Sequence, residues 1–255
     1  MCGLKGKNIL YLAKKYDPSV QVGNIKTKPI LEEVKEETLV LPKNLVPVYR
    51  PTRDPDIRAV RKYLERRGLT KTKILRWRIM TAQKGPLRRY AVIPSFDKFG
   101  NLNYYVSRSI DEGGIRYKNA KIKKSNVVFN EIDIDWTQGV NLVEGVFDAI
   151  KCPENTIPIL GSSLSEKSKV IQELTRNQSA VTVSLDPDMP EKAYEVAEMI
   201  RQTGCKTYIA FAPHNRDLGD LSYAKAKEVI VNKFAYDPYL KIKHKIGTLR
   251  SGSVF

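Results

Sequence analysis

Three pairs of acidic residues follow one another along the second half of the sequence, in an order that suits a catalytic metal site. Each pair stands directly after an apolar run of strand length, or in the loop after one, and a helical pattern follows each. The carboxyl ends of parallel strands meet at one edge of a sheet, so these acids are expected to converge there. The pairs are Glu144 with Asp148, Asp186 with Asp188, and Asp217 with Asp220.

Carboxylates gathered in this way need a cation. Two of them about 4 Å apart repel by roughly 4 kcal/mol at an effective dielectric constant near 20. Mg²⁺ typically takes one or two carboxylates together with waters and substrate phosphates, which suits Asp186 and Asp188 on either side of a turn. Each motif taken singly can also be explained as an ordinary turn, since Asp and Pro are favoured in turns. Their joint occurrence favours a metal site.

The elements that must position these acids are predicted from periodicity. Strands are expected over 140–143, 157–160, 180–185 and 206–211, with amphipathic helices between them, which indicates a parallel sheet covered on both faces. Upstream, helical spacing over 54–75 breaks at Arg67-Gly68 and predicts two basic helices. Alternation over 90–110 predicts a hairpin that turns around 97–101.

Composition points to a polyanionic partner. The 255 residues, 42% of them hydrophobic, carry a formal charge of +16, and residues 50–89 hold 14 Lys or Arg against 3 Asp or Glu. Nucleic acid is the expected polyanion; an anionic membrane surface is the alternative, but the segment lacks the bulky apolar face of interfacial helices. Three scattered cysteines and the lack of a long apolar run predict a reducing, cytoplasmic location and no membrane partner.

The motifs resemble the TOPRIM domain, and more narrowly the TOPRIM-type DNA primases of bacteria and their viruses. Glu144-Gly145-x-x-Asp148, Leu160-Gly161 and Asp186-x-Asp188 are similar to the family's motifs. The upstream segments 63–69, 93–101 and 116–119, with Lys124, look like the opening of the primase core. The resemblance implies an α/β fold: a TOPRIM Rossmann-like parallel sheet preceded by a smaller basic α+β subdomain.

Domain boundaries are predicted from the resemblance and from composition. We expect a zinc-ribbon remnant over 1–16, a linker over 17–48, a basic subdomain over 49–138, a TOPRIM domain over 139–235 and a flexible basic tail over 236–255. Cys2 is the one zinc-ribbon ligand present, and four are needed to close a structural site. Zn²⁺ is therefore not expected to be held by this chain alone. Either the chain is a fragment or a separately encoded module supplies the ribbon.

The resemblance and the chemistry imply roles for single residues. Asp186, Asp188 and Asp217 are expected metal ligands, and Glu144 either binds metal or moves a proton. Asp148 and Asp220 are weaker candidates, because Asp148 suits a helix N-terminus and Asp220 an N-cap. We expect Arg108, Arg116 and Lys124 to bind the nucleotide and template phosphates. Arg88 and Arg89 are added to this group on their position alone.

The expected function is a DNA primase core that makes short RNA primers on single-stranded DNA from NTPs with Mg²⁺, or with Mn²⁺. A replicative helicase is a further expected partner, and the expected setting is the cytoplasm of a bacterium or a bacteriophage-infected host. The sequence departs from the family at Pro190, Glu191 and Arg216, and Glu191 places an extra charge near the expected metals. Two alternatives remain open: a TOPRIM nuclease, and a catalytically weak single-stranded nucleic-acid-binding subunit of a replication complex.

Overall fold

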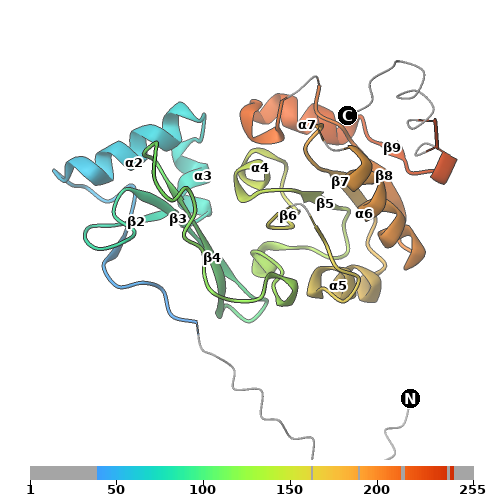
Figure 1. Ribbon diagram of the computed structural model, residues 1–255, viewed down its shortest axis with the longest axis horizontal. Coiled ribbons are helices and arrows are strands. Elements are labelled where there is room, and N and C mark those ends of the chain that lie inside the picture. Colours follow the sequence, from blue (N-terminus) through green and yellow to red (C-terminus); the bar gives the residue numbers. More distant parts are fainter. Residues whose placement is uncertain (1–38, 162, 189, 214–215, 240–241, 244–255) are drawn as a thin grey trace, which may run out of the picture. The chain divides into compact units, whose positions relative to one another are not determined.

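The computed structural model describes residues 39–161, 163–188, 190–213, 216–239 and 242–243 (Figure 1). An antiparallel sheet with two helices precedes a mostly parallel five-stranded sheet with helices, so the predicted α/β fold class is confirmed. Cys2 and most of the predicted tail lie outside the described residues. The predicted domain boundaries stay predictions. Within the described part of the chain, no helix is long and apolar enough to cross a bilayer.

The first sheet has the order β1-β2-β3-β4, and every neighbouring pair is antiparallel. Its strands are β1 (Leu45–Pro47), β2 (Met80–Ala82), β3 (Tyr90–Phe96) and β4 (Leu102–Ser109). β3 and β4 form the predicted hairpin, whose tip is closed by Asp97 accepting from the N–H groups of Phe99 and Asn101. β1 lies within the segment 17–48 that was predicted as a linker. Val46 and Val48 are buried, and Pro47 is tolerated because β1 is an edge strand.

Two helices follow β1 as predicted, α2 (Pro55–Arg66) and α3 (Lys71–Arg76). Asp54 caps α2 by accepting from the N–H groups of Asp56 and Ile57, and Pro55 occupies the first turn. Ile57, Val60 and Leu64 share one face and are buried against the sheet. After α2 the chain turns at Gly68, whose φ of +74° is in the region that favours glycine.

The second sheet has the order β6-β5-β7-β8-β9, in which only the β8–β9 pair is antiparallel. Its strands are β5 (Val140–Val143), β6 (Thr156–Pro158), β7 (Val181–Ser184), β8 (Thr207–Ile209) and β9 (Phe234–Ala235). The four predicted strands are confirmed in position. β6 ends before the predicted residue 160, because Leu160 and Gly161 both adopt positive φ and turn the chain away. β9, two residues long, is too short to have been predicted from its pattern.

Helices cover both faces of this sheet. Side chains of α5 (Lys169–Asn177) and α6 (Pro190–Gln202) pack with Val140, Leu142 and Val183 on one face. On the other face, α4 (Val146–Lys151) and α7 (Tyr223–Val231) pack with Val143. α4 also enters the core of the first sheet through Phe147 and Ile150. Short 3₁₀ turns complete the described chain: η1 (Lys124–Asn126), η2 (Glu131–Asp133) and η3 (Leu218–Asp220).

Candidate active site

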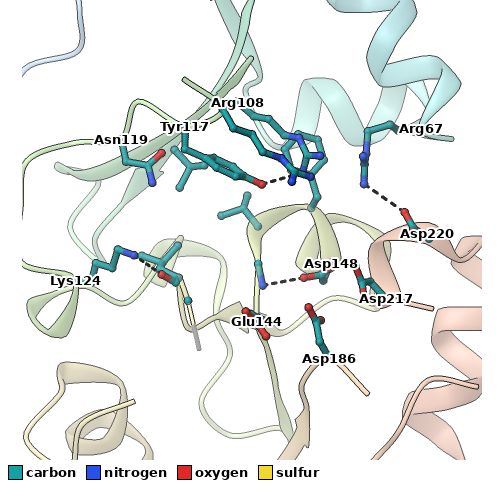
Figure 2. A pocket seen from close by; sticks show the side chains of 17 residues that line it. Arg67, Arg108, Tyr117, Asn119, Lys124, Glu144, Asp148, Asp186, Asp217 and Asp220 are labelled. Carbon is teal, nitrogen blue, oxygen red and sulfur yellow. Dashed lines mark hydrogen bonds and ion pairs between the residues drawn. The ribbon is translucent and has the colours of Figure 1, made fainter. Parts of the chain in front are cut away.

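Carboxylates from three neighbouring parallel strands line one cavity of about 700 Å³. Glu144 directly follows β5, Asp186 stands two residues after β7, and Asp217 lies in the loop between β8 and η3. Asp148 in α4 and Asp220 in η3 line the same cavity. Figure 2 shows Glu144, Asp148, Asp186 and Asp217 gathered on one side of it. The structure thus brings together five of the six predicted acids, although their roles stay predictions.

The turn between β5 and α4 is held by Asp148. Its carboxylate accepts from the Gly145 N–H at 2.8 Å and from the Gly219 N–H at 2.9 Å. A Cβ atom on Gly219 would lie 2.5 Å from the Asp148 Oδ1 atom, so this approach requires glycine. Asp148 therefore fixes the positions of Glu144 and Asp217 relative to each other, in agreement with the structural alternative that its helix position suggested.

The crowding of acids shifts their proton affinities. Burial, followed by the charges of Asp148, Glu144, Asp217 and Asp188, raises the pKa of Asp186 to about 7. Burial also raises the pKa of Asp148 to about 6, against the lowering effect of its two backbone hydrogen bonds. The pKa of Asp217 is raised as well, first by burial and then by Asp220 and Asp188. The cavity therefore favours either a proton or a cation beside these side chains.

Two of the predicted acids take up positions at the margin. Asp188 is exposed and does not line the cavity, although its charge acts on Asp186 and Asp217. Asp220 pairs with Arg67 at 3.5 Å. The suggestion that Asp220 caps a helix starting near Leu221 is wrong, because α7 starts at Tyr223 and its N-cap is Ser222.

Basic and aromatic side chains form the opposite wall. Arg108, Arg116 and Lys124 line the cavity, as the prediction of phosphate-binding residues requires. Arg108 donates to the Tyr117 hydroxyl at 2.8 Å, and Lys124 donates to the Leu160 carbonyl at 2.6 Å. Figure 2 shows Arg108, Tyr117 and Lys124 across the cavity from the carboxylates. The cavity can thus hold a divalent cation on one wall and an anion on the other.

Phe147 joins the two walls. Its buried ring lies 5.1 Å from the Arg67 guanidinium and 5.2 Å from that of Arg108, so both arginines contact one aromatic ring at cation–π distance. The sequence pattern did not predict a site role for Arg67, which it placed only at the end of a helix. It also predicted none for Tyr117, which was noted only as part of the basic segment 116–119. Both line the cavity. The signal that was available for Arg67 is its position at the C-cap of α2, next to a turn.

Other predicted residues lie elsewhere. Arg89 pairs with Asp56 at 2.9 Å and with Asp111 at 2.6 Å, and Arg88 also pairs with Asp56, so both brace the start of α2 away from the cavity. Tyr104, an aromatic residue of the β3–β4 hairpin, is a core residue with 1% exposure and does not line the cavity. Pro190, one of the departures from the family, is the first helical residue of α6.

The donor set fits a hard divalent cation held through waters. Among the described residues, no three His, Cys, Asp or Glu side chains form a closed ligand cluster. Mg²⁺ needs no such cluster, since one or two carboxylates suffice with waters and substrate phosphates. Burial, and then the charges of neighbouring acids, raise the pKa of Asp186 to about 7, so a cation nearby would stabilise its charged form. Asp217 and Glu144, on the adjoining strand ends, are the next candidates.

Comparison with known proteins shows that the fold of this chain is similar to that of several solved structures. No protein-family model and no curated protein matches the chain. Among solved structures, a DnaG primase catalytic domain bound to ssDNA matches with a TM-score of 0.61 and 18% identity, over 72% of this chain and 74% of that one. A DNA primase domain from Pseudomonas aeruginosa matches with a TM-score of 0.59 and 17% identity, over 73% and 75%.

A third match is the Aquifex aeolicus primase with its zinc-binding and RNA polymerase domains, with a TM-score of 0.58 and 18% identity. The alignment covers 75% of this chain and 59% of that structure. The described part of the chain is therefore similar in its α/β fold to DnaG primase catalytic domains, and its five-stranded sheet carries the carboxylates.

Proposed function

We propose that this chain is the catalytic core of a DNA primase, which joins NTPs into a short RNA on a single-stranded DNA template. One observation carries the proposal: carboxylates at three neighbouring strand ends face arginine and lysine side chains across a single cavity. The fold likeness to primase catalytic domains supports it. Mg²⁺, or Mn²⁺ in its place, is the proposed metal.

The reaction is the attack of a 3′-hydroxyl on an α-phosphorus, with pyrophosphate leaving. When bound, the divalent ions would lower the pKa of the hydroxyl and neutralise the departing charge. Asp186 and Asp217 are the proposed ligands inside the cavity, with Asp188 at its margin. Glu144, directly after β5, is assigned either to the metal or to the proton of the attacking hydroxyl.

The basic wall is assigned to the triphosphate and the template backbone. Arg108 and Arg116 offer planar guanidinium donors that match phosphate oxygens, and Lys124 adds a point charge. The Phe147 ring and the Tyr117 hydroxyl hold Arg108 in place before substrate arrives. Donors fixed in advance lower the reorganisation that the transition state requires. Arg67, on the other side of the ring, is a further proposed phosphate contact, although it must share its charge with Asp220.

Two partners are proposed from outside the chain, a zinc-ribbon module and a replicative helicase. The zinc-ribbon proposal is motivated by the Aquifex structure, which contains a zinc-binding domain beside its RNA polymerase domain and of which the alignment covers 59%. A nuclease or a binding subunit would use the same surfaces as a primase. A binding measurement alone therefore cannot distinguish these three functions.

The test is labelled-NTP incorporation on single-stranded DNA with Mg²⁺ or Mn²⁺, with and without an added zinc-ribbon fragment. Wild type is compared with Asp186→Ala and Asp188→Ala, and with Glu195→Gln on the exposed face of α6 as the control. Short RNA that both alanine variants lose and the control keeps supports the primase. If no RNA forms under any condition, the template decides: cut DNA means a nuclease, and intact DNA means a binding subunit.

A further inference from the structure

A second cavity, of about 630 Å³, adjoins the acidic one. The two share Lys124, Leu160 and Gly161 as lining residues. One wall of the second cavity is the segment from Lys123 to Val127, which includes η1, and the other is the connection from β6 to α5. The hydrogen bond from Lys124 to the Leu160 carbonyl joins these walls at the boundary between the cavities.

The charged side chains among the described residues that line the second cavity are all basic, whereas the first cavity combines an acidic and a basic wall. Lys123 and Lys124 line it together with the hydroxyl side chains of Ser125, Ser163 and Ser165. No Asp or Glu occurs among the described residues that line it, whereas five line its neighbour. The N-terminus of α5, whose N-cap Ser168 also lines it, adds positive partial charge. A ligand that carries negative charge and oxygen atoms that accept hydrogen bonds would therefore bind favourably in this cavity.

The remaining lining restricts the class of ligand. Val127, Ile159 and Val170 are buried and give the cavity an apolar floor. None of the described lining residues is aromatic, so the cavity offers no platform on which a base could stack. The volume lies within the range of roughly 300–1,000 Å³ that ligand sites occupy. Phosphates and sugars, rather than bases, match these walls.

We propose that this second cavity holds the sugar–phosphate backbone of one nucleic-acid strand, which extends from the acidic cavity past Lys124. The inference rests on the proposed function in one respect, that the end of a polynucleotide lies at the carboxylates. Template DNA and product RNA share the phosphodiester chemistry that the lysines and serines recognise. Because the contacts avoid the bases, binding in this cavity is independent of sequence.

The test is equilibrium binding of fluorescent single strands of one sequence, one made of DNA and one of RNA, across a range of salt concentrations and without NTPs. The variants are Lys123→Glu and Ser163→Glu, which place negative charge on opposite walls of the second cavity. Neither residue lines the acidic cavity and both are exposed, so the fold should survive. Lys227→Glu on the exposed surface of α7 is the control, and it matches the net-charge change of Lys123→Glu and exceeds that of Ser163→Glu.

We expect each variant to weaken binding by about tenfold, the scale of one charge-assisted hydrogen bond. The salt slope should also fall by about 0.7 for each phosphate that the variant no longer binds, and the control should change neither quantity. Weaker binding of DNA alone assigns the cavity to the template, and weaker binding of RNA alone assigns it to the product. Weaker binding of both strands assigns it to a shared backbone path.

Unchanged binding of both strands by both variants, or an equally weakened Lys227→Glu control, would overturn the proposal. The readout needs no turnover. A chain that makes no RNA can therefore still show the cavity's binding role, and an active primase can still fail this test.

Discussion

The Asp148 carboxylate accepts a hydrogen bond from the Gly219 backbone N–H at 2.9 Å, across 71 residues of sequence. The same carboxylate accepts from the Gly145 N–H at its own helix terminus. One half-buried side chain thus ties the turn that carries Glu144 to the loop that carries Asp217. The relative positions of the two acids depend on this contact rather than on either loop alone.

Breaking that contact should lower both stability and activity. Asp148→Ala leaves two backbone N–H groups unpaired, at about 1–3 kcal/mol each, so we expect a total loss of about 2–6 kcal/mol in the free energy of unfolding. Gly219→Ala forces its Cβ atom against the Asp148 Oδ1 atom and should act through the same contact. Urea unfolding together with NTP incorporation measures both effects.

The double variant supplies the check. Since both substitutions remove one contact, their combined cost should be less than the sum of the single costs. Gly139→Ala is the matched control, because its Cβ atom would make an ordinary contact of 3.6 Å with the Ala180 carbonyl. Additive costs for Asp148→Ala and Gly219→Ala would mean that the contact does not couple the two loops.

Phe147→Met should loosen the two arginines that its ring holds. Methionine keeps an apolar side chain of similar volume but removes both cation–π contacts, each worth about 0.5–1 kcal/mol. We expect KM for NTPs to rise roughly three- to tenfold, with a smaller change in kcat, because the substitution reaches the triphosphate through Arg67 and Arg108. Phe96→Met, which removes the ring beneath Arg78 outside the cavity, is the comparison. Equal effects of the two substitutions on KM would argue against a positioning role for Phe147.

Asp186→Asn should stabilise the metal-free protein. The substitution removes one charge from a crowded group of acids, whose mutual repulsion adds to burial in raising the pKa of Asp186 to about 7. At pH 8 in EDTA we expect Tm to rise by a few degrees. A gain of about 1 kcal/mol in the free energy of unfolding raises Tm by about 4–8 °C in a small domain and by less in a chain of this size. Wild type should gain Tm when Mg²⁺ is added and the variant should gain less. A Tm gain from Mg²⁺ that Asp186→Asn leaves intact would place the cation elsewhere.

Stability should also depend on an ion pair far from the acids. Hydrogen bonds from Arg89, and then from Arg88, lower the pKa of Asp56 below its usual value. A lowered folded-state pKa adds stability above the unfolded-state value near 4, and this stability is lost as pH falls through the folded-state value. Asp56→Asn should therefore lower the free energy of unfolding by about 1–2 kcal/mol at pH 7 and by progressively less below pH 4. Urea unfolding at pH 7 and pH 3, with Glu112→Gln as the exposed control, measures the difference; a cost that does not depend on pH would contradict it.

The sequence predicts the sheet and the acids well because both depend on local patterns. Apolar runs of strand length fix the parallel strands, and residues that directly follow parallel strands must meet at one sheet edge, so Glu144 and Asp186 could be placed without coordinates. Asp217 stands well past Ile209, where β8 ends, so this rule alone does not place it; the loop after β8 brings it to the same cavity.

The basic wall could not be predicted residue by residue. Arg88 and Arg89 looked equivalent to Arg108 in a basic segment, yet Asp56 and Asp111 pair with them at the start of α2 and in the loop after β4. Arg67 reaches the cavity because α2 ends beside α4, a packing relation that no local pattern contains. β1 was taken for linker because three residues around a proline carry too little periodicity to indicate a strand.

Template-directed RNA synthesis by these carboxylates can be tested with templates of defined sequence. Single-stranded templates of defined sequence are incubated with the protein, Mg²⁺ and four NTPs, of which one in turn is labelled. We predict short, alkali-labile products whose labelled nucleotide follows the template, present in wild type and absent in Glu144→Gln and Asp186→Asn. Products that ignore the template, that persist in both variants, or that fail to appear even with Mn²⁺ and an added zinc-ribbon fragment would contradict the account.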